Sequence, residues 1–187
     1  MPFYRLCAVL LPIATAAALS SCSISMVAGP LSGKAPTLSR LPSGRRLVLY
    51  DGVCNFCNRW VNFVIDNDPK GVFCFASMQS TAGREALAAC GRDPNDLSTF
   101  MLIDEEGFWT QSTAALRVAQ SLQPAVLRGA GTAFEPLPPF FRDGIYRLVA
   151  ENRYSILGRA QDGTAPSCQL KYDIETLRAR MLDFDER

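Results

Sequence analysis

Two cysteines separated by two residues have the clearest chemical potential in this 187-residue chain. Cys54 and Cys57 follow residues 47–50, a short apolar run with the length of a buried strand. From Cys57 onward, apolar residues recur at helical spacing, which predicts a helix that begins near the cysteines. The first turn of a helix presents unpaired N–H groups and the positive end of the helix dipole, so it favours a thiolate. Because a thiolate is the attacking species in disulfide exchange, the pattern indicates thiol–disulfide chemistry.

The positions of the two cysteines predict different roles for them. Cys54 is nearest the helix start and is expected to be exposed, so it is the candidate nucleophile. Cys57 is expected to face inward and to act as the resolving thiol. Asp51, three residues before Cys54, could take or give the proton during exchange, as a buried carboxylate can. The alternative is that Asp51 only shapes the turn after the strand.

Cys-x-x-Cys patterns also occur in metal and haem sites. A structural zinc site needs four ligands, whereas this chain has no histidine and its other downstream cysteines, Cys74, Cys90 and Cys168, are widely spaced. A c-type haem site needs His directly after the second cysteine, and residue 58 is Asn. We therefore expect no cofactor. The alternative to redox activity is a non-catalytic binding module whose dithiol is a structural disulfide or holds a metal.

The elements around the cysteines follow a recognisable order. Apolar runs predict strands at residues 47–50, 72–76, 99–103 and 108–111. Helices are predicted after the first strand, at residues 80–90 with Ser80 as N-cap, and at 112–122 with Ser112 as N-cap. Strand, helix, strand, helix, hairpin and helix is the order of a thioredoxin-like α/β domain. We therefore predict a central mixed four-stranded sheet flanked by helices.

The remainder of the chain predicts a C-terminal helical extension. Residues 124–139 are punctuated by Gly and Pro and are expected to be mostly loop. Residues 140–156 form an amphipathic pattern, and we expect Phe140 and Phe141, like Trp60, to lie in the core. Residues 173–184 predict a short charged helix.

Charge is distributed unevenly along the chain. Five of the 19 Lys and Arg residues precede Asp51, whereas no Asp or Glu does. From Asp51 onward, 14 basic residues stand against 18 acidic ones, so the folded part is mildly acidic. This balance argues against nucleic acid as a partner. With 48% apolar residues, the chain can bury an ordinary single-domain core.

The N-terminal stretch has the composition of a targeting sequence. Residues 6–19 are uncharged and follow Arg5, but the run is too short for a membrane span, so a cleaved signal peptide is expected. Residues 26–46 contain Ser, Pro, Gly and Arg without acid, as transit peptides do. The combination resembles the two-part presequences of algae with complex plastids. The alternatives are a secreted or endomembrane protein, a lipoprotein acylated at Cys22, or an uncleaved anchor.

We therefore expect residues 1–44 to be presequence, 45–170 the thioredoxin-like domain and 171–187 a C-terminal helix. No stable membrane insertion is expected.

The sequence also resembles the DCC thiol-disulfide oxidoreductases, a thioredoxin-like family marked by Asp-x-x-Cys-x-x-Cys. The marker stands at residues 51–57. Further matching segments follow in order at residues 75–80, 112–116, 143–146, 152–154 and 158–159, and at Cys168. The resemblance implies exchange with protein disulfides through Cys54 and Cys57, with an unknown electron donor.

The resemblance places Cys168 at the family's C-terminal cysteine, which could approach the dithiol as a third redox partner. The chain departs from thioredoxin itself in one respect. Where thioredoxins carry a cis-proline before the third strand, this sequence has Leu97-Ser98-Thr99.

Overall fold

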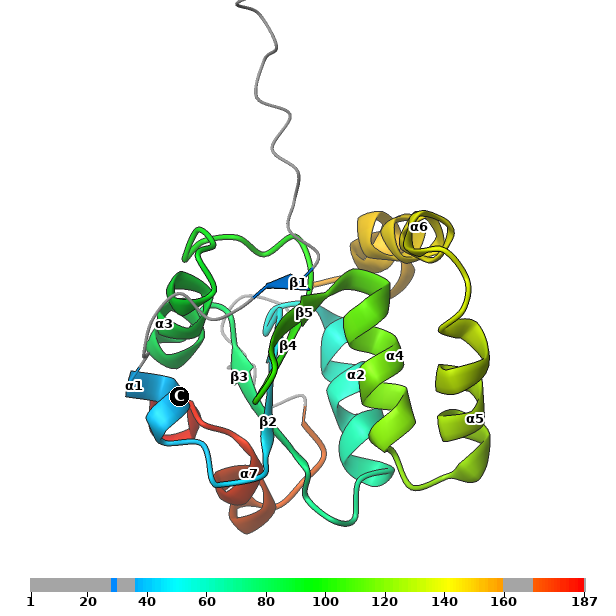
Figure 1. Ribbon diagram of the computed structural model, residues 1–187. Helices are drawn as coiled ribbons and strands as arrows, with labels where there is room; N and C mark the ends of the chain where they lie inside the picture. The colour runs from blue at the N-terminus through cyan, green and yellow to red at the C-terminus, as the bar shows by residue number, and fades with distance from the viewer. Residues whose placement is uncertain (1–27, 30–35, 160–169, 187) are drawn as a thin grey trace, which may run out of the picture.

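A mixed β-sheet of five strands forms the centre of the structure (Figure 1). The computed structural model describes residues 28–29, 36–159 and 170–186. Within these ranges the strands are β1 (Ala28–Gly29), β2 (Arg46–Tyr50), β3 (Phe73–Ser77), β4 (Met101–Asp104) and β5 (Gly107–Thr110). Their order across the sheet is β1-β5-β4-β2-β3.

Strand directions agree with the predicted α/β class. β2 and β3 are parallel, as a strand–helix–strand connection requires, while β4 is antiparallel to both β2 and β5. This arrangement is consistent with a thioredoxin-like fold. The predicted strand number was wrong by one, because β1 adds to the sheet edge by pairing Ala28 with Trp109 and Gly29 with Phe108. A strand of two residues has no periodic pattern of its own.

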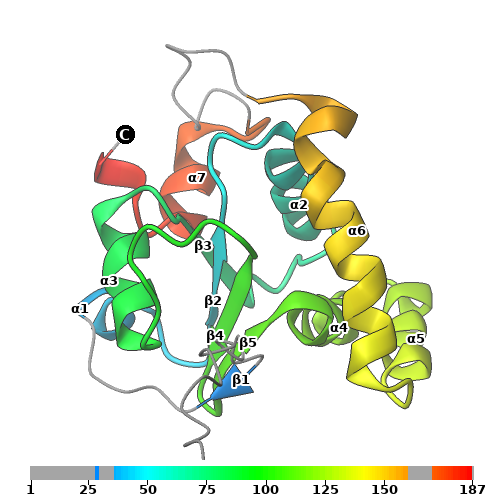
Figure 2. The same cartoon turned by 90° about the horizontal axis from the view of Figure 1, so that it is seen from above.

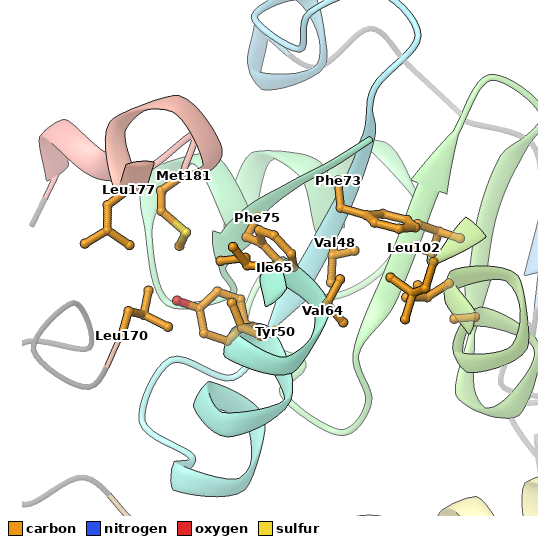
Figure 3. Packing of buried hydrophobic residues seen from close by; sticks show 14 residues of the cluster. Val48, Tyr50, Val64, Ile65, Phe73, Phe75, Leu102, Leu170, Leu177 and Met181 are labelled. Atoms are coloured by element: carbon orange, nitrogen blue, oxygen red, sulfur yellow. The ribbon is translucent and has the colours of Figure 1, made fainter. Parts of the chain in front are cut away.

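Helices cover both faces of the sheet (Figure 1). The helices of the described ranges are α1 (Pro36–Ser39), α2 (Asn55–Asp66), α3 (Thr81–Ala89), α4 (Gln111–Ser121), α5 (Ala125–Phe134), α6 (Pro139–Leu157) and α7 (Ile174–Arg180), with a 3₁₀ turn at Phe184–Glu186. Val48 and Tyr50 of β2 pack with residues of α2, α4 and α7 (Figure 3). Leu47 and Leu49 pack with residues of α3 on the other face. Because both faces are covered, β2 has a continuous buried run over residues 47–50 rather than an alternating pattern.

Residues 124–139 form mostly helix, so the prediction of a loop was wrong. Gly131 of α5 is buried against α4, where an added Cβ would lie 2.8 Å from Cγ of Gln120 and 3.1 Å from the Leu116 carbonyl oxygen. Glycine therefore permits the two helices to approach closely. Gly131, one of the residues that suggested a loop, is instead required for helix packing.

The predicted burial of Phe140 and Phe141 was also wrong. Their side chains are 68% and 64% exposed at the start of α6. α6 runs from α4 towards α2 (Figure 2) and turns a largely polar face inward, on which Asp143 is buried. Asp143 accepts hydrogen bonds from the hydroxyl and the N–H of Ser112. Ser112 thus binds α6 rather than capping α4, whose N-cap is Thr110.

The C-terminal helix is shorter than the predicted 173–184, because α7 ends at Arg180. Beyond it Met181 forms a parallel β-bridge with Phe75 of β3. The Leu182 N–H then donates to the Phe75 carbonyl over 2.9 Å, and the Asp183 carboxylate accepts from the Ser77 N–H over 3.0 Å. Arg180 also forms a buried ion pair with Asp68 over 2.6 Å. These contacts protect the edge of the sheet.

Part of the predicted presequence contacts the fold. α1 lies beside α3, and Leu38 and Leu41 pack against the core on that face of the sheet. Residues 1–27 and 30–35 lie outside the described ranges, so cleavage of the N-terminal stretch stays a prediction. No helix that the structure describes has both the length and the apolar character needed to cross a membrane.

Close packing of α3 on β3 gives a first testable prediction. A Cβ added at Gly83 would lie 2.0 Å from the Ser77 carbonyl oxygen, so the backbone itself would have to move. We expect Gly83→Ala to lower the free energy of unfolding by about 1–3 kcal/mol, measured by urea denaturation.

Gly144→Ala is the matched control, because nothing lies within 4 Å of its added Cβ in α6. There, higher helix propensity should leave stability unchanged or raise it by up to about 1 kcal/mol. Equal stability of the two variants would contradict the close contact at Gly83.

Candidate dithiol site

The turn between β2 and α2 positions both thiols. Cys54 is the N-cap of α2, and its Sγ accepts a hydrogen bond from the Cys57 N–H over 3.3 Å. The Cys54 N–H in turn donates to the Asp51 carbonyl over 3.2 Å. Both cysteines are free thiols in this structure. The predicted placement of the pair at a helix start is therefore confirmed.

Hydrogen bonding makes the two thiols chemically different. The hydrogen bond from the Cys57 thiol lowers the pKa of Cys54 to about 7, with the Cys57 N–H contributing, although burial and the charge of Asp51 oppose this shift. The same bond raises the pKa of Cys57 far above its usual value, and burial and the nearby negative charges add to the effect. The lowered pKa favours the thiolate form of Cys54 near neutral pH, whereas the raised pKa of Cys57 favours its thiol form.

Exposure of the two cysteines is the reverse of what we predicted. Cys54 has no exposed surface, whereas Cys57 is only partly buried. Residues 158–159, which directly follow α6, cover Cys54. The backbone of Cys54 forms a β-bridge with Arg159, and the Asn55 N–H donates to the Gly158 carbonyl over 3.3 Å. Gly158 has φ 75° and ψ −178°, a conformation open essentially to glycine alone. Attack by Cys54 on a large substrate therefore requires this backbone to move.

Asp51 is buried between the dithiol turn and two other parts of the chain. One carboxylate oxygen accepts from the Val53 N–H over 3.2 Å and from the Gln79 amide over 2.7 Å. The other accepts from the Tyr154 hydroxyl and from the Arg153 guanidinium over 3.4 Å. The bond to Val53 supports the turn-forming role, and the charge also raises the pKa of both thiols. The structure therefore brings together all three predicted site residues.

Gln79, in the loop after β3, holds one side of the site in place. Its side-chain oxygen accepts from the Gly52 N–H over 3.0 Å and from the Ser77 hydroxyl over 2.6 Å, which aims its amide at Asp51. A Cβ on Gly52 would lie 2.5 Å from the Ser77 hydroxyl oxygen. Gly52 is thus required for the close approach of the two turns.

Arg153 connects the site to the segment that stands where thioredoxins have a cis-proline. Its guanidinium donates to the Leu97 carbonyl over 2.9 Å and to the Ser98 carbonyl over 3.2 Å. The next residue, Thr99, shares a hydrogen bond of 2.7 Å with the Tyr146 hydroxyl. Side chains of α6 therefore hold this segment in place beside the dithiol.

Comparison with known proteins agrees with this geometry. A family model described as DCC1-like thiol-disulfide oxidoreductase matches residues 48–159. The chain belongs to this family. It is 35% identical to the uncharacterized protein YuxK of Bacillus subtilis, over 72% of this chain and 96% of that protein. It is 37% identical to the chloroplastic DCC family protein At1g52590 of Arabidopsis thaliana, over 67% of this chain and 70% of that protein. No solved structure matches the chain.

Sequence reasoning gave no role to Gln79, Arg153 or Tyr154, although they complete the site of this DCC1-like protein. The available signal was the family resemblance, because all three fall in matching segments, at residues 75–80 and 152–154. The remaining cysteines are accounted for in part. Cys74 is buried as predicted, and burial raises the pKa of Cys90 to about 12. Cys168 lies outside the described residues.

The thiol hydrogen bond predicts how the reactivity of Cys54 depends on pH. Alkylation of Cys54, followed by mass spectrometry of its peptide, should rise with pH through an inflection near 7 and then level off. Cys57→Ser should keep this inflection low, because a hydroxyl can still donate to the thiolate. Cys57→Ala should move it upward. Identical inflections in the two variants would show that the side chain at 57 does not control Cys54.

Proposed function

We propose that this protein exchanges disulfides with protein partners through Cys54 and Cys57. The observation that carries the proposal is the N-cap thiol of Cys54, whose pKa is lowered to about 7 by the Cys57 thiol beside it. A depressed pKa supplies thiolate at neutral pH, which is the species that attacks disulfides. Membership of a family of thiol-disulfide oxidoreductases supports the same chemistry.

Exchange proceeds in two displacements. The Cys54 thiolate attacks one substrate sulfur, the substrate S–S bond breaks, and the released substrate thiolate takes a proton. Cys57 then loses its proton and attacks the Cys54 sulfur, which releases the second substrate thiolate. Two electrons pass to the substrate, and the protein is left with a Cys54–Cys57 disulfide. The reverse sequence oxidises a substrate dithiol, and an external dithiol donor regenerates the reduced form.

The second displacement needs a proton acceptor, because the pKa of Cys57 is strongly raised. We propose that Asp51 serves as this acceptor, since the chain has no histidine and the charge of Asp51 acts on both thiols. Once Cys54 is in a mixed disulfide, its negative charge is gone and Cys57 loses its hydrogen-bond acceptor. Both changes make Cys57 easier to deprotonate.

Complete burial of Cys54 favours the alternative function, a binding module whose dithiol is not catalytic. Within the described ranges, Cys, Asp and Glu side chains form no group of three or more that could hold a metal. Turnover of insulin disulfides separates the two functions. Redox activity predicts catalytic reduction and less than about a tenth of an equivalent of zinc in the purified protein, whereas stoichiometric zinc without turnover identifies the alternative.

The wider context follows from the same proposal. We infer a thioredoxin-like domain acting on protein disulfides in an organelle, with a plastid favoured by the predicted two-part presequence and by the chloroplastic name of the Arabidopsis relative. Secretion or an endomembrane location is the alternative. Nucleic acid is not among the proposed partners, and we propose no stable membrane insertion.

Single cysteine variants test the assigned roles. Cys54→Ser should abolish exchange, because it removes the thiolate of low pKa. Cys57→Ser should instead accumulate mixed disulfides with substrate, since the attacking thiol remains and the resolving one is gone. Non-reducing electrophoresis and mass spectrometry measure these adducts. Adducts that form in the Cys54 variant but not in the Cys57 variant would reverse the roles.

Asp51→Asn tests the proton acceptor, because the two roles of this residue predict opposite effects. Loss of the charge should lower the pKa of both thiols, so a purely electrostatic role predicts equal or faster exchange near pH 6. If Asp51 accepts the proton of Cys57, resolution of the mixed disulfide should slow several-fold at neutral pH. Single-turnover kinetics measure this step directly.

Tyr154→Phe is the matched comparison, since it removes a hydrogen bond to the same carboxylate oxygen but keeps the charge. Equal slowing in both variants would show that Asp51 acts only by ordering the site.

A further inference from the structure

A cavity of about 220 Å³ opens beside Cys57, and the exchange mechanism does not use it. It lies between α2, the segment that leads into β4, and α6. Most of its wall is apolar, with Phe56, Trp60, Leu97, Phe100 and Val149 among the lining residues. The cavity is therefore a built apolar site next to the reactive pair.

Most polar groups of the wall already have hydrogen-bond partners, and the Nε of Arg153 is the buried exception among the described residues. The hydroxyls of Thr99 and Tyr146 share a hydrogen bond, and Arg153 binds Asp51 and two backbone carbonyls. A polar ligand would have to displace these bonds, whereas an apolar group would only displace water. The largely apolar wall and the paired hydroxyls thus favour an apolar occupant.

Size and ring geometry favour an aromatic occupant. An apolar cavity of ~150 Å³ is enough to hold benzene, and this cavity is larger. Its wall includes a chain of tilted rings, with Trp60 and Phe100 centroids 4.8 Å apart and Phe100 and Tyr146 centroids 5.9 Å apart. A further ring can join such a chain in the tilted or offset geometry that aromatic pairs prefer.

The cavity continues into an exposed apolar stripe on α6, which favours a polypeptide over a small molecule. Val149 belongs to the cavity wall and is also 38% exposed. Ile145, one helical turn before Val149, is 68% exposed, and the adjacent Leu148 is 65% exposed. Phe141 extends the stripe by one more turn. An apolar chain segment that enters the cavity could therefore remain in contact with α6 beyond it.

We propose that this cavity binds an aromatic side chain of the substrate polypeptide, adjacent in sequence to the disulfide-bonded cysteine. The proposal rests on the exchange function above and names its substrate class. With the ring in the cavity, the neighbouring cysteine lies beside Cys57, and Cys54 attacks its disulfide when the backbone of residues 158–159 moves. The protein therefore selects polypeptide disulfides flanked by aromatic residues over those flanked by small or charged ones.

Binding is measured without chemistry in the full-length Cys54→Ser/Cys57→Ser variant. Two cysteine-free peptides differ only by Phe or Ala next to the Ser that replaces cysteine, and affinity is measured calorimetrically and by tryptophan fluorescence. We expect the Phe peptide to bind at least about tenfold more tightly. Equal affinities would overturn the proposal, whatever the behaviour of further variants.

Two substitutions on α6 test whether the preference for the Phe peptide arises in the cavity. Ala150 lines the cavity, so Ala150→Leu should fill it and remove the preference for Phe. Ser155→Leu adds the same side chain at an exposed position of the same helix and should retain the preference. A preference for Phe that survives Ala150→Leu would place the aromatic site elsewhere and overturn the assignment.

Turnover of disulfide-bonded versions of the two peptides by the unmodified protein separates this inference from the proposed function. A kcat/KM about tenfold higher for the Phe peptide supports both. Reduction of the two peptides at equal rates overturns the aromatic preference and leaves the exchange function standing. Selective binding of the Phe peptide with no reduction of either overturns the exchange function and leaves the cavity as an aromatic-binding site.

Discussion

The rest of this site depends on the hydrogen bonds that the buried carboxylate of Asp51 accepts. A buried charge is tolerated only when it is paired and hydrogen-bonded, and here the donors come from three separate parts of the chain. They are the dithiol turn itself, the loop after β3 through Gln79, and the inner face of α6 through Arg153 and Tyr154. This charged group therefore links α6 to the thiols, together with the contacts of Asp143 with Ser112 and of Tyr146 with Thr99. The cavity beside Cys57 and the cover over Cys54 are both consequences of the position of α6.

The orientation of α6 is unusual for a surface helix. A surface helix normally buries its apolar stripe, whereas α6 directs Asp143, Tyr146 and Arg153 inward and exposes Phe141 and Ile145. The inward polar contacts give the helix a defined position, and the outward apolar stripe leaves a surface that extends the cavity. This division is consistent with the proposal that one helix both orders the dithiol turn and contacts a substrate.

Local sequence patterns predicted what depends on local physics. The apolar runs of β2 and β3, the Ser80 cap and the placement of Cys54 at a helix start all follow from neighbouring residues. Burial was predicted less well, because it depends on distant partners. The cover over Cys54 comes from residues 158–159, and the exposure of Phe140 follows from contacts of α6 with Asp51 and Ser112. Gly131 in α5 was misinterpreted for the same reason, since its role is to permit close contact with α4.

We propose that Cys54 and Cys57 form a redox-active pair whose reduction potential is set by the hydrogen bond between them. The most direct test of this proposal is the reduction potential of the full-length protein, measured by equilibration with defined thiol–disulfide buffers and mass spectrometry of the Cys54–Cys57 peptide. A reversible two-electron couple between about −120 and −270 mV, the range of known exchange proteins, is the predicted result. A disulfide that stays oxidised below about −300 mV, or that never forms, would contradict the account, because the pair would then be structural or inert.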